Sequence, residues 1–167
     1  MVKGKNMIQT INQYAKTYSD PPERERIASR GLIIRNGKIL LSYEKNTDVY
    51  MSPGGGLESG ETLEECCVRE LKEETGYLVK TQKYFLKINE YCFETMYVSN
   101  YFVCDIIGIS EQSLTDIEIE HGIIPVWLDV EKALEIFGDY ASHREDIASL
   151  YLREFTVLNK YLEMNES

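Results

Sequence analysis

Residues Gly55–Tyr77 read GGLESGETLEECCVRELKEETGY, and this stretch is the most informative part of the chain. It contains seven glutamates and only two basic residues, so its charge is −5, half of the net charge of −10 of the whole chain. Like charges four residues apart on a helix repel each other, whereas a divalent cation bound by their oxygens removes that repulsion. The stretch therefore predicts a site for a hard cation such as Mg²⁺, Mn²⁺ or Ca²⁺.

Helix signals are present at both ends of this stretch. Thr62 stands at the N-cap position and Glu65 follows three residues later, which is the pattern of a capping box. Gly76 stands where a left-handed residue ends a helix. Apolar residues recur every fourth position between them and predict one buried face, formed by Leu63, Cys67 and Leu71. We therefore expect a helix over residues 63–75.

Three carboxylates of this helix share one patch. At 100° per residue, Glu70, Glu73 and Glu74 fall within about 100° of one another. The loop ahead of the helix, residues 52–56, reads SPGGG and has almost no side chains. Glycine lets a backbone approach a ligand closely, so we expect the three acids to act on a ligand admitted by this loop.

The stretch resembles the Nudix box, G-x5-E-x7-R-E-U-x-E-E-x-G-U, in which U is an aliphatic residue. Tyr77 is the one departure, an aromatic residue where an aliphatic one is usual, and it bears on packing more than on chemistry. A pattern with so many fixed spacings is specific. The other positions match: Gly55, Glu61, Arg69, Glu70, Leu71, Glu73, Glu74 and Gly76.

The resemblance implies a fold and an activity. The fold is a Nudix-type α/β/α sandwich with a mixed β-sheet, as one domain over residues 1–167 in which residues 1–20 form an N-terminal extension. The activity is hydrolysis of a pyrophosphate bond in a nucleoside di- or triphosphate linked to another moiety. The implied cofactor is Mg²⁺ or Mn²⁺.

The resemblance also implies roles for individual residues. Arg69 would orient the glutamates through charge-assisted pairs. A carboxylate of the box would activate the attacking water. The metal ligands would be Glu70, Glu73, Glu74 and the carbonyl of Gly54, and the residues with structural roles would be Glu61, Gly55 and Gly76.

Residues outside the box give weaker candidates. For a further acid we consider Glu118 and Glu120, then Asp116 and Glu111, although single acids are usually surface residues. For stacking of a nucleobase the candidates are Tyr50, Phe93 and Trp127, together with Tyr43, although such aromatic residues more often pack a core. Four basic residues could contact phosphates or cover an edge strand: Arg24, Arg26, Arg30 and Lys45.

Two other functions remain open. One is a non-catalytic nucleotide-binding module that regulates a partner, against which the complete set of box glutamates counts. The other is a pyrophosphohydrolase of RNA 5′ ends, against which the net charge of −10 counts. The substrate is therefore expected to be a small nucleotide, with nucleic acid disfavoured.

Composition sets further limits. A chain of 167 residues with 43% hydrophobic residues can bury a sizeable core. No apolar run is long enough to cross a membrane, and the N-terminal six residues do not open a signal peptide, so we expect a soluble cytoplasmic protein. The spacing of the four cysteines does not fit a zinc site and predicts reduced, buried thiols.

Periodicity predicts the remaining elements. Strands are expected at 27–34, 38–43, 77–91, 94–107 and 118–128, and Asn36-Gly37 predicts a two-residue hairpin. Helices are expected at 129–137 and at about 143–164. The last helix has apolar residues that could pack on the chain's own sheet or pair with a second subunit in a homodimer, namely Tyr151, Leu158, Tyr161 and Leu162.

Overall fold

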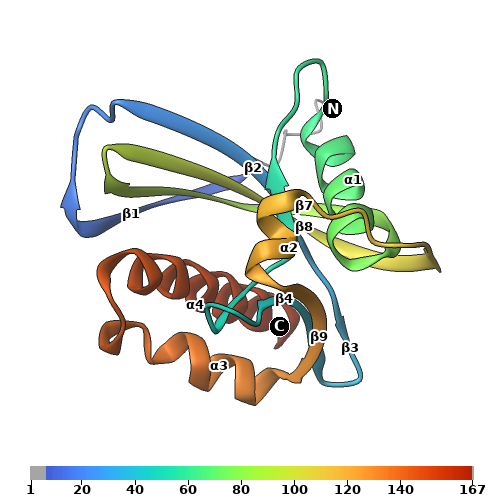
Figure 1. Ribbon diagram of the computed structural model, residues 1–167. Coiled ribbons are helices and arrows are strands. Elements are labelled where there is room, and N and C mark those ends of the chain that lie inside the picture. Colours follow the sequence, from blue (N-terminus) through green and yellow to red (C-terminus); the bar gives the residue numbers. More distant parts are fainter. Residues whose placement is uncertain (1–6, 167) are drawn as a thin grey trace, which may run out of the picture.

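A five-stranded mixed sheet carries most of the chain's strands in the computed structural model, which describes residues 7–166. The expectation about the first six residues lies outside the described part. The strand order is β1-β7-β8-β2-β6 (Figure 1). The pairs β1–β7 and β2–β8 are parallel, whereas β7–β8 and β2–β6 are antiparallel. The strands are β1 (Gln9–Tyr18), β2 (Arg24–Leu32), β6 (Gly54–Gly56), β7 (Tyr77–Phe93) and β8 (Thr95–Ile109).

A second sheet is arranged around β4 (Lys38–Glu44), which pairs with β3 (Ile34–Arg35), β5 (Val49–Met51) and β9 (Ile123–Asp129). The predicted two-residue turn is confirmed: Asn36 and Gly37 have φ of 53° and 74°, as the favoured hairpin turn requires. The single strand predicted over 27–34 was wrong. The chain leaves the first sheet after Leu32 and enters the second at Ile34, so one buried run serves both sheets.

The predicted helix of the acidic stretch is confirmed as α1 (Leu63–Thr75). The Thr62 side chain accepts from the Glu65 amide at 3.1 Å, and Gly76 ends the helix with φ of 77°. Glu65 does not return the bond to the Thr62 amide; its carboxylate accepts from the Thr62 hydroxyl instead, at 3.0 Å. The helix therefore has one half of the predicted capping box.

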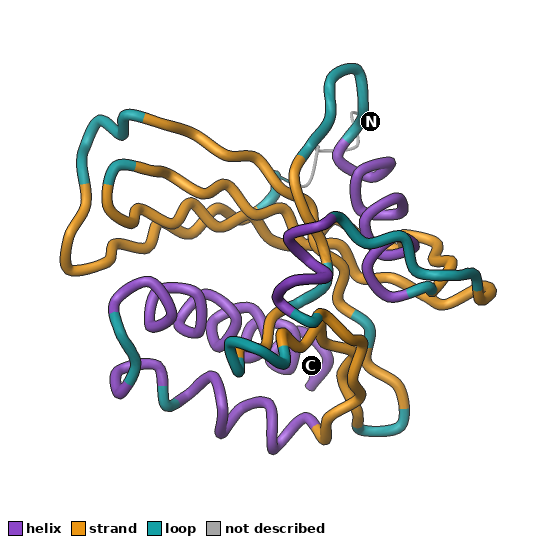
Figure 2. The backbone as a smooth tube through the Cα atoms, in the orientation of Figure 1, coloured by secondary structure: helices purple, strands orange, loops and turns teal. Residues whose placement is uncertain are grey.

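The strand predicted over 118–128 was wrong in its first half. Residues Asp116–His121 form the short helix α2, and β9 begins only at Ile123. The reason is local: Thr115 and Glu118 form a complete capping box, and Gly122 adopts φ of 69° as a left-handed C-cap. A loop precedes α2, and β9 follows it after Gly122 (Figure 2).

The C-terminal part contains α3 (Val130–Gly138), a 3₁₀ turn (Tyr140–Ser142) and α4 (Glu145–Glu166). Asp129, the residue before α3, makes no side-chain cap bond and pairs with Lys38 at 2.9 Å. The helix expected over 129–137 therefore begins one residue later, without a side-chain cap, and ends at Gly138.

Helices cover both faces of the five-stranded sheet, because alternate residues of a strand point to opposite faces. Tyr101 of β8 joins a core with residues of α3 and α4, whereas Phe102 joins a second core with Cys67 and Leu71 of α1. In Figure 1, α3 and α4 lie on one side and α1 lies apart from them. The predicted α/β class with a mixed sheet is confirmed.

The last helix packs on the chain's own core. Of the two alternatives left open for these residues, packing within the chain applies: Tyr151 and Leu158 are 2% and 1% exposed, and Tyr161 and Leu162 also pack against this core. A homodimer through other surfaces stays untested. Within residues 7–166, no helix combines the length and the apolar character that crossing a membrane requires. All four cysteines are free and buried, as predicted.

Candidate active site

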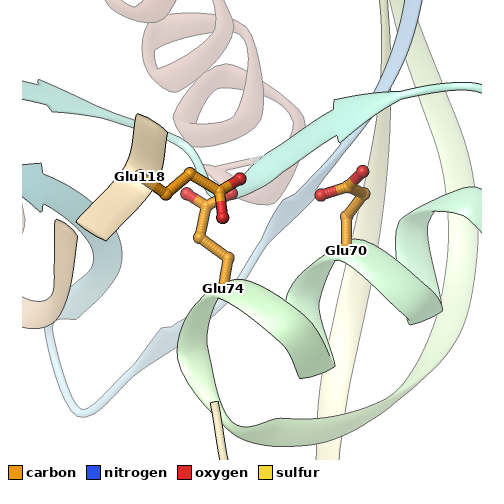
Figure 3. A group of neighbouring side chains, drawn as sticks. All are labelled: Glu70, Glu74 and Glu118. Atoms are coloured by element: carbon orange, nitrogen blue, oxygen red, sulfur yellow. The ribbon is translucent and has the colours of Figure 1, made fainter. Parts of the chain in front are cut away.

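Three carboxylates from two helices meet beside Gly54 and Gly55 of the glycine loop. Glu70 and Glu74 stand one turn apart on α1, and Glu118 reaches them from α2 (Figure 3). Each contributes an oxygen to a group in which all the oxygens lie within 4.8 Å of one another. Three oxygen donors at this spacing match the ligands that Mg²⁺ and Mn²⁺ prefer, so the donor set fits a divalent cation.

Glu74 is the most deeply placed of the three acids, with 4% of its surface exposed. Burial raises its pKa from the ordinary 4.5 to about 7, because it disfavours the charged form, and the neighbouring Glu70 and Glu118 act in the same direction. Arg30 opposes this shift. The backbone amide of Gly54 donates to Glu74 Oε2 at 3.4 Å. The described residues therefore compensate the negative charge of these carboxylates only in part.

Glu70 is the acid of this group that lies against Gly55 of the glycine loop. Burial raises its pKa and the bond to Arg69 opposes the shift. A Cβ atom built on Gly55 would lie 2.5–2.6 Å from the Glu70 carboxylate. Only glycine at position 55 therefore lets the loop lie directly against this carboxylate.

Arg69 connects the rest of the box. Its guanidinium donates to Glu61 from Nε at 2.6 Å and from Nη2 at 3.1 Å, and Nη1 donates to Glu70 at 2.9 Å and to Glu73 at 3.1 Å. Nη2 also donates to the carbonyl of Gly56 at 3.0 Å. The bond from Arg69 lowers the pKa of Glu61. These contacts are those that the predicted orienting role of Arg69 and the predicted structural role of Glu61 require.

Glu73 is not a member of the three-oxygen group. Its carboxylate is bound to the same Arg69 nitrogen that binds Glu70, so it lies beside the group and not in it. Its role as a metal ligand stays a prediction. The carbonyl of Gly54 likewise stays a predicted ligand, and Gly76 ends α1.

Of the candidate further acids, the structure brings only Glu118 to the site. The other three are exposed and outside the group: Glu111, Asp116 and Glu120. The capping box explains the difference, because the Glu118 carboxylate accepts from the Thr115 amide at 2.8 Å and so is directed back over the start of α2. The sequence pattern Thr-x-x-Glu was the available signal for this helix, and the strand interpretation missed it.

The candidate stacking residues have other partners. Tyr50 stacks on Tyr43 with ring centroids 4.3 Å apart. Trp127 donates through Nε1 to the Tyr77 hydroxyl at 3.2 Å. Phe93 is the last residue of β7, just before the turn into β8. This turn is at the end of the β7–β8 hairpin away from α1 (Figure 1). The structure does not bring these rings together around the acids.

A cavity of about 130 Å³ lies on the other side of the glycine loop. Arg26 and Arg30, which were considered as phosphate contacts, line it, and Arg153 lines it from α4. Tyr97 completes it from β8, where it pairs in register with Arg26. Arg153 and Tyr97 were missed, because only the strand register and the docking of α4 bring them to this place. Gly55 and Gly56 form the border between this arginine pocket and the acids.

The metal-free protein should lose stability as pH rises. Between pH 4.5 and about 7 the folded state holds a proton on Glu74 that the unfolded chain has released, so raising the pH through this window favours unfolding. Glu74→Gln removes this dependence. Melting temperatures measured in EDTA from pH 4.5 to 8 should therefore show the variant gaining on the wild type as pH rises. Parallel curves for the two proteins would contradict the assignment of this raised pKa to Glu74.

Comparison with known proteins agrees with this geometry. Residues 25–150 match the NUDIX domain. An ADP-ribose pyrophosphatase of Methanocaldococcus jannaschii is 37% identical over 90 residues, which cover 45% of this chain and 53% of that protein. A putative 8-oxo-dGTP diphosphatase of Bacillus subtilis is 32% identical over 102 residues, covering 61% of this chain and 65% of that protein. The match thus spans about half to two thirds of these relatives.

A Nudix hydrolase from Nitrosomonas europaea has the same fold, with a TM-score of 0.61 and 22% identity over 80% of this chain and 89% of that one. The fold and the acid-bearing helix beside a glycine loop define a Nudix domain, and the match over residues 25–150 includes both. The chain belongs to the Nudix family.

Proposed function

We propose that the chain is a metal-dependent hydrolase that cleaves a pyrophosphate bond in a nucleoside diphosphate linked to another group. The observation that carries the proposal is the group of three carboxylates, Glu70, Glu74 and Glu118, with oxygens within 4.8 Å of one another. Three acids that close repel one another unless a cation is present. The names of two relatives, an ADP-ribose pyrophosphatase and a putative 8-oxo-dGTP diphosphatase, support the same reaction class.

The chain's own residues would hold Mg²⁺ or Mn²⁺ through these three carboxylates. Such an ion, when bound, neutralises charge on phosphate oxygens and lowers the pKa of a coordinated water. Arg69 keeps the Glu70 carboxylate in place through a charge-assisted bond of 2.9 Å. Without the ion, the pKa of Glu74 is raised to about 7, so this carboxyl is partly protonated near neutral pH and would release its proton when the cation binds.

The substrate would extend from the acids across the glycines into the arginine pocket. Arg26 and Arg30 offer guanidinium groups, which bind phosphate oxygens in a bidentate manner. Gly55 and Gly56 have no side chains that would block this path. A substrate with a diphosphate centre and a second polar or anionic part fits this pocket better than a simple monophosphate, which would leave one half of the site unused.

A hydrolysis screen tests the proposal. The purified chain with Mg²⁺ or Mn²⁺ should release phosphate-containing products from at least one member of a panel of nucleoside triphosphates, nucleotide sugars, ADP-ribose, dinucleoside polyphosphates and capped RNA. Products are separated by ion-exchange chromatography, with an EDTA sample as the control. Cleavage only of capped RNA would favour the RNA alternative, and nucleotide binding without cleavage of any compound would favour the regulatory module.

A further inference from the structure

A buried carboxylate on the C-terminal helix accepts hydrogen bonds from the loop that leads into the glycines. Glu154 of α4 is 2% exposed. Its Oε1 accepts from the Ser52 amide at 3.1 Å, and its Oε2 accepts from the Ser52 hydroxyl at 2.6 Å. Ser52 is itself 1% exposed. Both oxygens of a carboxylate more than 100 residues away in sequence thus fix one residue of the loop.

Ser52 is connected to both halves of the candidate site, the arginine pocket and the group of acids. The Ser52 carbonyl accepts from Arg30 Nη1 at 3.0 Å, so the loop holds one arginine of the pocket. Two residues further on, the Gly54 amide donates to Glu74 at 3.4 Å, and Gly55 lies against Glu70. A shift of Ser52 would therefore move the backbone on which both the acids and the pocket depend.

Glu154 is kept in place by a second set of contacts. Arg153 Nη2 donates to Glu154 Oε1 at 3.2 Å, and the Tyr101 hydroxyl donates to the same oxygen at 3.3 Å. Arg153 also donates from Nη1 to Glu90 at 2.9 Å. All of these side chains are at least nine-tenths buried. Buried ion pairs contribute little net stability compared with apolar packing, so a role in fixing geometry is the better account of this one.

We propose that Glu154 is a positioning residue for the Nudix site: it sets the place of Ser52 and, through it, of the Gly54 amide and Arg30. It touches neither substrate nor metal ligands. The effect on the loop is independent of the reaction, whereas the consequence for metal affinity and turnover rests on the proposed function.

Glu90 provides a matched control. It is 4% exposed and binds the same Arg153, as Glu154 does, but its second oxygen accepts from the Ser149 hydroxyl at 2.6 Å and not from the loop. Ser52 and Ser149 are therefore a second matched pair, because each hydroxyl donates at 2.6 Å to a glutamate bound to Arg153. Only one member of each pair reaches the site.

The test compares Ser52→Ala with Ser149→Ala, and Glu154→Ala with Glu90→Ala, in the full chain. Hydrogen exchange of a peptide covering residues 49–57 reports the loop without metal or substrate. A hydrogen bond to a charged group is worth enough to change an opening equilibrium about tenfold, so exchange should be ~10-fold faster in Ser52→Ala and faster still in Glu154→Ala. Ser149→Ala should exchange there as the wild type does, and Glu90→Ala should have a smaller effect than Glu154→Ala, because Glu90 reaches the loop only through Arg153 and Glu154.

Mn²⁺ affinity by calorimetry and steady-state kinetics follow on the same variants. Ser52→Ala and Glu154→Ala should weaken Mn²⁺ binding and lower kcat by roughly 3- to 10-fold, with Ser149→Ala unchanged and Glu90→Ala less affected than Glu154→Ala. Equal effects in both members of each pair, or none in Ser52→Ala, would overturn the positioning role. If Glu154→Ala does not fold, the serine pair decides. A wild type that binds no Mn²⁺ would instead contradict the proposed function, and the exchange data would still decide the positioning role.

Discussion

Glu74→Gln should lower kcat by at least about 10²-fold, because it removes a negative oxygen donor from the centre of the acid group. The same change should abolish the rise in melting temperature that Mg²⁺ or Mn²⁺ produces by binding the folded state. The metal-free variant should be at least as stable as the wild type at pH 8, since the wild-type carboxylate is buried beside two other acids. Steady-state kinetics and thermal unfolding with and without metal measure the three effects.

The controls compare two acids of α2, one inside the acid group and one outside it. Glu118→Gln should share the loss of metal stabilisation, whereas Glu120→Gln, two residues away on α2 but exposed and outside the group, should behave as the wild type. Na⁺ at matched ionic strength should not reproduce the effect of the divalent ion. Near wild-type turnover in Glu74→Gln would remove the acid group from the mechanism. Glu73→Gln tests separately whether Glu73 leaves Arg69 to become a ligand.

The part of the fold that could be predicted is the part with local rules. For the helix over 63–75, Thr62 predicts the start, Gly76 predicts the end, and apolar residues at every fourth position predict the buried face. The structure has the same bounds. The hairpin at Asn36-Gly37 likewise depends on two adjacent residues. Such signals act within one element, so tertiary contacts did not change them.

The predictions that failed depended on contacts between elements. The apolar run through Ile33 gives no sign of where one sheet ends and the next begins, because both parts are buried. For Tyr151 and Leu158 the sequence left open whether they pack on the chain's own sheet or on a second subunit, because a helical stripe does not say which surface covers it, and both are buried within the chain. Whether residues 1–167 form one domain stays a prediction.

The residues of the site also fall into two groups, those placed by a single helix and those placed by the docking of one element on another. The spacing of Arg69, Glu70 and Glu74 on one helix fixes their contacts, so the sequence could indicate them. Glu118 and Arg153 enter only when α2 and α4 dock, and no local pattern states where a helix docks. The sequence could rank Glu118 among four acids, and the packing selects one of them.

Arg69→Gln should lower kcat/KM by at least about 10²-fold, because one guanidinium fixes several groups of the box at once. It binds Glu61 at 2.6 Å, Glu70 at 2.9 Å and Glu73 at 3.1 Å. Without this cation the three carboxylates repel one another and Glu70 loses the bond that holds it beside Gly55. Turnover of the substrate found in the screen, together with metal affinity by calorimetry, measures the loss.

Lys72→Gln is the matched control, since it removes the other basic residue of α1 at an exposed position. Both variants change the charge of the helix by the same amount, so a purely electrostatic effect on substrate approach would appear in both. The positioning effect should appear only in Arg69→Gln, and mainly in kcat, because a Glu70 that has lost its bond to Arg69 would no longer hold the metal in the right place for the reacting phosphate. Equal losses in the two variants would mean that Arg69 acts through net charge alone, and its contacts with Glu61 and Glu70 would then have no part in catalysis.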